Sequence, residues 1–169
     1  MASNSSFDVS TGADLQEVDN AVNQAKKELA QRYDFKGSKV ASIEFEKTKE
    51  PKIVLVADDD FKMTALFDLL QGRLIKRGVP VKNLVIGDNA VAGMSTVRKE
   101  ILLTQAIAGD KAKEITKAIK EGGFKKVTSS IQGDEVRVSA PSRDELQAVM
   151  GMLRAKDFGI ELKFGNYRG

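Results

Sequence analysis

The sequence contains neither cysteine nor histidine among its 169 residues. Without cysteine, the chain has no disulfide bond, no thiolate nucleophile and no thiolate metal ligand. Without histidine, it also lacks the commonest general base and a usual zinc ligand. These two absences exclude enzymes that depend on cysteine or histidine, and they exclude zinc sites built from those side chains.

Long apolar runs are also absent, since none reaches the roughly 18 residues that a membrane-spanning helix needs. The first residues lack the basic segment followed by an apolar segment that marks a secretory signal. We therefore expect a cytoplasmic protein with no membrane segment. The net charge of +3 falls mostly after residue 95 and is a mild indication of anionic partners.

The pattern of apolar residues gives the same order of elements twice. Runs of strand-forming residues predict eight strands, over residues 7–9, 39–46, 52–57, 81–86, 96–103, 125–131, 135–139 and 160–164. Helical spacing predicts four helices, beginning near residues 14, 58, 110 and 142. Each half therefore has the order βαββαβ, which can close as a four-stranded antiparallel sheet with two helices on one face.

This order predicts an α+β protein of two tandem ferredoxin-like, RNP-like domains. We expect the first half to span residues 1–88 and the second half residues 96–169, with the small residues of 89–95 as the linker. The order of elements leaves open whether each first strand stays in its own half. An exchange of first strands between the halves is also compatible with the sequence.

The two sheets are expected to differ on their open faces, because the side chains between the core positions differ. In the second half these side chains are polar, and Arg98 and Arg137 are expected to share one face. In the first half, Val54, Val56 and Val85 make the open face apolar. We expect the other half of the chain or a second subunit to cover that face.

The acidic run Asp58-Asp59-Asp60 has two interpretations. Carboxylates of this kind can bind Mg²⁺, but they also cap helix N-termini, and capping is favoured because no distant carboxylate partner is evident. The sequence has no Walker motif and no G-x-G-x-x-G motif between a strand and a helix. We expect no metal site, no cofactor and no enzymatic activity.

RNA-recognition modules share the βαββαβ order and stack bases on aromatics of their central strands. No aromatic lies in the corresponding strands here, at residues 52–57 and 135–139. Arg and Lys contacts to phosphates would then give RNA binding without sequence specificity. Two other segments, Tyr33–Gly37 and Gly165–Arg168, place aromatic and basic residues together. Such pairs can hold a base and a phosphate, although each segment can equally be a turn with a packed aromatic ring.

Several sequence blocks occur in the order found in the YajQ family of bacterial proteins. They are Ser6–Ser10, Glu17–Ala21, Tyr33–Gly37, Ala57–Lys62, Gln132–Val138, Ser142–Gln147, Asp157–Gly159 and Phe164–Arg168. The sequence thus resembles this family from Phe7 to Arg168. The resemblance implies two ferredoxin-like domains, nucleotide binding and no known catalytic activity. It also implies several candidate roles, because some members are described as RNA-binding and others as cyclic di-GMP receptors that influence transcription.

Taken together, the sequence predicts a noncatalytic nucleotide-binding protein, with cyclic di-GMP, GTP or ATP as ligand and a site between the halves. The candidate site residues are aromatic or basic residues chosen by chemistry and motif position: Phe35, Lys36, Lys62, Arg98, Arg137, Arg143, Tyr167 and Arg168. Two alternatives remain open. One is a sequence-nonspecific RNA-binding protein, and the other is a protein-interaction module that partners a transcription regulator.

Overall fold

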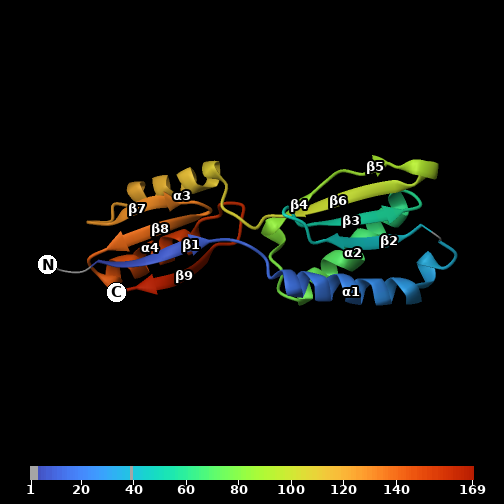
Figure 1. Ribbon diagram of the computed structural model, residues 1–169, viewed down its shortest axis with the longest axis horizontal. Helices are drawn as coiled ribbons and strands as arrows, with labels where there is room; N and C mark the ends of the chain where they lie inside the picture. The colour runs from blue at the N-terminus through green and yellow to red at the C-terminus, as the bar shows by residue number, and fades with distance from the viewer. Residues whose placement is uncertain (1–3, 39) are drawn as a thin grey trace. The chain divides into compact units, whose positions relative to one another are not determined.

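The computed structural model describes residues 4–38 and 40–169 and divides into two compact units (Figure 1). Unit 1 comprises Met1–Gly12 and Thr104–Gly169, whereas unit 2 comprises Ala13–Leu103. Both units combine helices with an antiparallel sheet, as the sequence predicted. None of the helices within the described ranges is long and apolar enough to cross a bilayer.

Unit 2 has a sheet in the strand order β2-β3-β6-β4, with a short additional strand, β5, paired to β6. These strands are β2 (Ser42–Glu46), β3 (Lys52–Ala57), β4 (Leu84–Ile86), β5 (Ala90–Val91) and β6 (Val97–Leu103). Two helices pack on one face of the sheet, α1 (Leu15–Gln31) and α2 (Asp60–Lys76). Val18 and Val22 of α1 and Leu66 and Leu70 of α2 are buried against Leu55 of the sheet.

Unit 1 has a sheet in the order β7-β8-β1-β9. Its strands are β1 (Ser5–Ser10), β7 (Thr128–Gln132), β8 (Glu135–Ala140) and β9 (Lys163–Arg168). Its helices are α3 (Gly109–Glu121) and α4 (Arg143–Ala155). The core contains Phe7 of β1, Ile115 of α3 and Leu153 of α4, none of which is more than 1% exposed.

The first strands of the two halves are exchanged. Strand β1 lies between β8 and β9 of unit 1, where Phe7 is opposite Val138 and Val9 is opposite Phe164. Strand β6 lies between β3 and β4 of unit 2, where Ile101 is opposite both Ile53 and Ile86. Each exchanged strand occupies the central position that the first strand of a ferredoxin-like fold takes. The possibility that the sequence left open is therefore the observed arrangement.

The exchange moves the domain boundaries away from those expected at residues 88 and 96. The predicted linker, 89–95, contains β5 and a 3₁₀ turn at Gly93–Ser95, and β5 pairs with β6, so this segment belongs to unit 2.

The charge is more evenly divided between the two units than between the two halves of the sequence. Unit 1 has 12 Lys and Arg against 10 Asp and Glu, and unit 2 has 15 against 14, so neither unit is strongly basic.

The exchange of first strands also determines which side chains lie on the open face of each sheet. Arg98 and Arg137 do not share a face, because β6 and β8 lie in different sheets. Arg98 lies opposite Val56, and Glu100 lies opposite Val54, on the open face of unit 2. Val54 is buried and Val56 is half-buried. The hydrocarbon parts of these charged side chains can cover apolar neighbours in this way. Val85 on the same sheet is 53% exposed, so no second layer covers it within unit 2.

Helix ends follow the capping signals of the sequence. Asp59 caps α2, since its carboxylate accepts the backbone N–H of Lys62 at 2.7 Å. Asp58 accepts the Ser38 hydroxyl at 2.7 Å, and Asp60 accepts the Asn89 amide at 3.0 Å. The capping interpretation is thus confirmed for Asp59, whereas Asp58 and Asp60 accept hydrogen bonds from other side chains. Within 4–38 and 40–169, no group of three or more acidic side chains is arranged to hold a metal ion.

Most predicted strands have different bounds in the structure. Residues 81–83 form a 3₁₀ turn before β4, and β7 begins at Thr128 and not at residue 125. Strand β2 begins at Ser42, and Lys39, the first residue of the predicted strand, lies outside the described residues. The last strand is Lys163–Arg168 and not 160–164, although Ile160 is buried in the core of unit 1. A register shift between Ser6 and Asp8 accompanies Asn166, whose φ is +55°, so β9 bends as a β-bulge beside β1. The segment Gly165–Arg168 is therefore strand and not a turn.

Candidate functional site

The eight residues predicted for the site fall into two groups of four. Unit 2 contains Phe35, Lys36, Lys62 and Arg98, and unit 1 contains Arg137, Arg143, Tyr167 and Arg168. Within each unit, two or three of the four lie at a pocket and the others do not. The two pockets are described in turn below.

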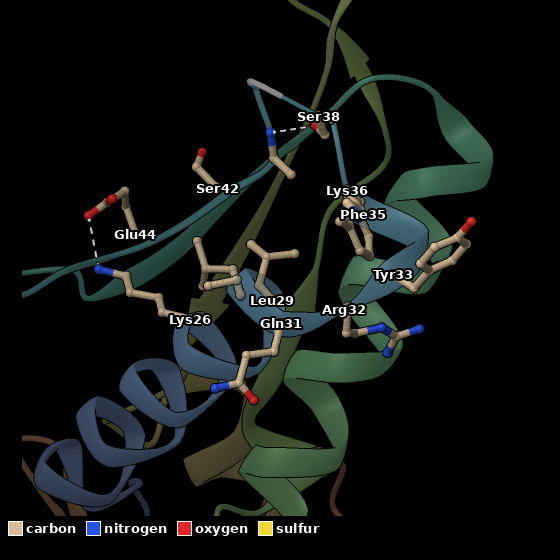
Figure 2. A pocket seen from close by; sticks show the side chains of 14 residues that line it. Lys26, Leu29, Gln31, Arg32, Tyr33, Phe35, Lys36, Ser38, Ser42 and Glu44 are labelled. Carbon is tan, nitrogen blue, oxygen red and sulfur yellow. Dashed lines mark hydrogen bonds and ion pairs between the residues drawn. The ribbon is translucent and has the colours of Figure 1, made fainter.

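The larger pocket lies in unit 2, between the C-terminal end of α1 and the beginning of β2, and we name it the α1–β2 pocket (Figure 2). Its volume is about 810 Å³. Its lining residues are Lys26, Leu29, Ala30, Gln31, Arg32, Tyr33, Phe35, Lys36, Gly37, Ser38, Ala41, Ser42, Ile43 and Glu44. Two predicted residues, Phe35 and Lys36, are therefore part of it. A volume of this size lies within the range of about 300–1,000 Å³ found for small-molecule sites.

Three basic side chains border this pocket. Lys26 forms an ion pair with Glu44 across it, at 3.5 Å between Nζ and Oε2. Arg32 donates from Nε and Nη2 to the two carboxylate oxygens of Asp34, at 2.9 and 2.7 Å. Lys36 is exposed, and no ion pair of Lys36 is found among the described residues. The pocket therefore offers the positive charge of Lys36. It also offers the Nη1 group of Arg32, which does not donate to Asp34.

The Arg32–Asp34 pair stays charged over a wide pH range. The hydrogen bonds from Arg32 lower the pKa of the Asp34 carboxyl, and the nearby charge of Lys62 acts in the same direction. In return, the hydrogen bond to Asp34 raises the pKa of Arg32. The guanidinium is thus held in one orientation at the edge of the pocket at neutral pH.

The two aromatic residues of the pocket differ in burial. Phe35 is only 5% exposed and packs into the core of unit 2, whereas Tyr33 is 88% exposed. In Figure 2, Arg32 and Tyr33 lie on one side of Leu29, and Lys26 and Glu44 lie on the other. Tyr33 is therefore the ring available to a ligand, and Phe35 anchors the segment that carries the lysine.

Lys62 acts on this segment from helix α2 and is not among the residues that line the pocket. Its ammonium group donates to the carbonyl oxygen of Asp34 and lies 5.4 Å from the centre of the Phe35 ring. Asp58, which precedes α2, accepts a hydrogen bond from Ser38, so Lys62 and Asp58 contact opposite ends of the segment Asp34–Ser38. The structure thus gives Lys62 the contacts of a positioning residue for Phe35 and Lys36.

Replacing Lys62 with methionine removes the charged donor and keeps the length of the side chain. We expect Lys62→Met to lower the free energy of unfolding by about 1–2 kcal/mol, because one charge-assisted hydrogen bond and one cation–π contact are lost. Lys62→Arg keeps both contacts and should lose less than half as much. Urea denaturation of the three proteins measures the difference. Equal losses for the methionine and arginine variants would contradict a specific role of the charged group.

The smaller pocket lies in unit 1, at the ends of β1, α4 and β9, and we name it the C-terminal pocket. Its volume is about 290 Å³. Its lining residues are Ser5, Ser6, Arg143, Leu146, Gln147, Met150, Tyr167, Arg168 and Gly169. Three of the predicted residues, Arg143, Tyr167 and Arg168, come together here.

Arg98 and Arg137 line neither pocket. Arg98 donates to Glu100 at 2.9 Å, and Lys52 donates to the same carboxylate oxygen at 3.2 Å. Hydrogen bonds from Arg98 and Lys52 therefore lower the pKa of Glu100. Arg137 donates from Nε to Asp8 at 3.0 Å on the open face of unit 1. The proposal that either arginine binds a ligand remains a prediction, and both already pair with a carboxylate.

Sequence comparison assigns the chain that contains these pockets to a protein family. The sequence profile of the family described as "Nucleotide-binding protein YajQ-like" matches residues 5–168. The chain belongs to the YajQ family. Its relatives include a protein of Desulfitobacterium hafniense (strain DSM 10664 / DCB-2), which is 50% identical over 168 residues, spanning 99% of this chain and all of the relative. YajQ-family proteins of Koribacter versatilis (strain Ellin345) and Geotalea uraniireducens (strain Rf4) are 48% and 49% identical over 168 and 166 residues.

The names of these relatives state binding and not a reaction. The protein from D. hafniense (strain DSM 10664 / DCB-2) and that from G. uraniireducens are each named "Nucleotide-binding protein". The family resemblance expected from the sequence blocks is therefore confirmed over nearly the whole chain.

Sequence reasoning missed three residues of the larger pocket, Lys26, Arg32 and Tyr33. Tyr33 is the first residue of the segment Tyr33–Gly37 and Arg32 precedes it, but neither is among the candidate site residues predicted from the sequence. Lys26 faces the pocket because it lies just over one helical turn before Ala30, and Glu44 reaches it only because β2 packs beside α1. The helical spacing could have indicated Lys26, whereas the contact with Glu44 depends on tertiary structure.

Proposed function

We propose that this chain binds a nucleotide in the α1–β2 pocket and leaves it chemically unchanged. The observation that supports this most directly is the pocket itself, where cationic side chains and an exposed tyrosine border an apolar floor. The floor is formed by Leu29 and Ile43, and Lys36 and Arg32 stand at its edge. A phosphate group would bind at Lys36 and at the free edge of the Arg32 guanidinium. A base would stack on Tyr33, since aromatic rings and guanidinium groups both stack on nucleobases.

The size of the pocket favours a large nucleotide. About 810 Å³ exceeds the space that a single nucleotide fills, and a cyclic dinucleotide offers two phosphates to the basic groups. We therefore take cyclic di-GMP as the first ligand to test, with GTP and ATP as the alternatives. A protein that holds such a ligand intact acts as a receptor, and its effect on transcription would pass through a partner.

The lining of the pocket supports binding without turnover. Histidine and cysteine are absent from the sequence, and the one acidic residue of the lining, Glu44, is paired with Lys26. Among the described lining residues, no second carboxylate accompanies Glu44 to form the pair of carboxyl groups that acid–base catalysis without histidine would need. RNA binding on the sheets has less support, because Arg98 and Arg137 of the open faces are paired with Glu100 and Asp8.

Reversing the charge of Lys36 tests the proposed site. We expect Lys36→Glu to weaken binding of cyclic di-GMP by at least tenfold, because a phosphate contact is lost and a repulsive charge is added. Isothermal titration calorimetry with cyclic di-GMP, GTP and ATP measures the dissociation constants.

Lys49→Glu is the matched control, because it changes the net charge by the same amount. Lys49 is exposed in the same unit and does not line the pocket. Its dissociation constant should stay within twofold of that of the unaltered protein. Equal weakening in both variants would indicate a general charge effect. Absence of saturable binding for all three nucleotides would overturn the proposal.

A further inference from the structure

The C-terminal pocket has the chemistry of a second ligand site, separate from the α1–β2 pocket. We propose that it binds a nucleoside monophosphate, with the phosphate at Arg143 and the base against Tyr167. All of its lining residues belong to unit 1, and none of them lines the larger pocket. The proposal therefore does not depend on the function proposed for unit 2.

Helix α4 supplies one wall of the pocket, with a polar row and an apolar row. Arg143 and Gln147 lie one turn apart, as do Leu146 and Met150, so each pair forms a row along the helix. Leu146 and Met150 are no more than 4% exposed, whereas Arg143 and Gln147 are exposed. The wall is thus apolar at depth and polar at its rim, as expected of a site that takes a flat ring with a polar edge.

Tyr167 supplies the opposite wall. Its ring is tilted by 40° against that of Phe7, with 6.4 Å between the ring centres, and its hydroxyl points at the sulfur of Met150 at 4.0 Å. These contacts fix one side of the ring, while 61% of the residue remains exposed. An exposed ring held in this way offers a stacking surface at little cost in side-chain entropy.

Arg143 is held in place at the end of the pocket. It donates from Nη2 to the carbonyl oxygen of Gly169 at 2.8 Å, and the hydroxyl of the buried Ser5 lies 3.5 Å from the same oxygen. One bond orients the guanidinium and leaves its other N–H groups for an anion. The first turn of α4 adds the positive end of the helix dipole. Asp144 and Glu145 of the same turn do not line the pocket.

The volume limits the ligand. At about 290 Å³, the pocket is near the lower end of the range for small-molecule sites, so it suits one nucleotide and not two. The distribution of groups then assigns the parts of that ligand: a base on the exposed face of the Tyr167 ring, an edge toward the Gln147 amide, and a phosphate at Arg143.

Calorimetric titration with AMP and GMP tests the site. We expect Arg143→Gln and Tyr167→Leu each to weaken binding of the preferred monophosphate at least tenfold, while Tyr167→Phe keeps the ring and changes affinity less than threefold. Lys156→Gln is the charge-matched control, because Lys156 is exposed at the end of the same helix and does not line the pocket. It should leave the affinity unchanged, and thermal denaturation of each variant should show that the fold is retained.

Further probes separate the parts of the ligand and the two sites. Inorganic phosphate alone and the nucleoside alone should each bind at least tenfold more weakly than the monophosphate. Equal binding of phosphate would show an anion site only, and would overturn the proposal. So would an Arg143→Gln affinity equal to that of Lys156→Gln, or no saturable binding of AMP and GMP. A loss of AMP or GMP affinity in Lys36→Glu as large as that in Arg143→Gln would move the ligand to the α1–β2 pocket and overturn the second site.

Discussion

Phe7→Ala is expected to destabilise unit 1 by about 3–5 kcal/mol, although Phe7 lies almost one hundred residues before the rest of that unit. Phe7 is fully buried in the core of unit 1, and its ring meets that of Phe164 edge-on at 5.8 Å. It also lies on β1, the strand between β8 and β9. Truncation therefore leaves a cavity at the centre of the sheet, where the surrounding structure relaxes least.

The matched variant is Ile101→Ala, which removes the equivalent buried residue of β6 in unit 2. Its expected loss is about 2–5 kcal/mol. Hydrogen exchange followed by mass spectrometry separates the two units. Phe7→Ala should increase exchange in β8 and β9, and Ile101→Ala should increase exchange in β3 and β4. The opposite pattern would mean that each first strand pairs within its own half, and equal loss everywhere would also contradict the exchange.

Asp8→Asn is expected to cost about 2 kcal/mol of folding free energy, because charge-assisted hydrogen bonds are lost at a nearly buried position. Asp8 is 4% exposed, and its carboxylate accepts from Arg137 at 3.0 Å and from the Asn166 amide at 2.6 Å. Arg168 lies 3.7 Å away. Burial by itself would raise the pKa of Asp8, but the hydrogen bonds and the positive charges outweigh it and lower the pKa.

This lowered pKa gives the stability a definite dependence on pH. The unfolded chain protonates Asp8 near pH 4. The stabilisation by Asp8 is therefore complete above that pH and is lost as the pH falls through the lower value of the folded protein. Denaturation curves between pH 7 and pH 2 should show that the difference between the unaltered protein and Asp8→Asn shrinks in acid.

Glu121→Gln is the control for Asp8, since Glu121 lies in the same unit and pairs with Lys117 at 3.9 Å while its side chain is 63% exposed. An exposed pair of this kind contributes less than about 1 kcal/mol. A loss for Asp8→Asn no larger than for Glu121→Gln, or one that persists unchanged at pH 2, would contradict the role assigned to Asp8.

Local features of the site could be read from the sequence, and long-range ones could not. The segment Tyr33–Gly37 was recognisable because an aromatic ring, a lysine and a glycine stand together after a helix. Gly37 has φ +90°, which fits glycine at that turn. The matching turn of unit 1 places Phe124 before Lys125 and Lys126, and Lys126 also has a positive φ of +59°. This repeat supports the duplication that the order of elements indicated.

The roles of Lys62 and Arg137 could not be distinguished from the sequence. Both are basic residues within or beside family blocks, so the sequence treats them as equivalent candidates. The structure gives Lys62 a carbonyl oxygen and a buried ring, and it gives Arg137 a buried carboxylate from the far end of the chain. Whether a basic side chain faces a ligand or another group of the protein depends on long-range contacts. The partner of Lys62 is 28 residues away in the sequence, and that of Arg137 is 129 residues away.

The sequence by itself determined the βαββαβ order of each half, the cap of α2 and the family, because periodicity, capping and motif blocks are local properties. Only the tertiary structure decided which sheet each first strand completes. Strand β1 alternates apolar and polar residues over Ser6–Ser10, whereas β6 has three charged residues followed by three apolar ones. Neither pattern by itself assigns its strand to one of the two sheets. Side-chain packing at Phe7 and Ile101 distinguishes the two arrangements, and packing is a property of residues far apart in the chain.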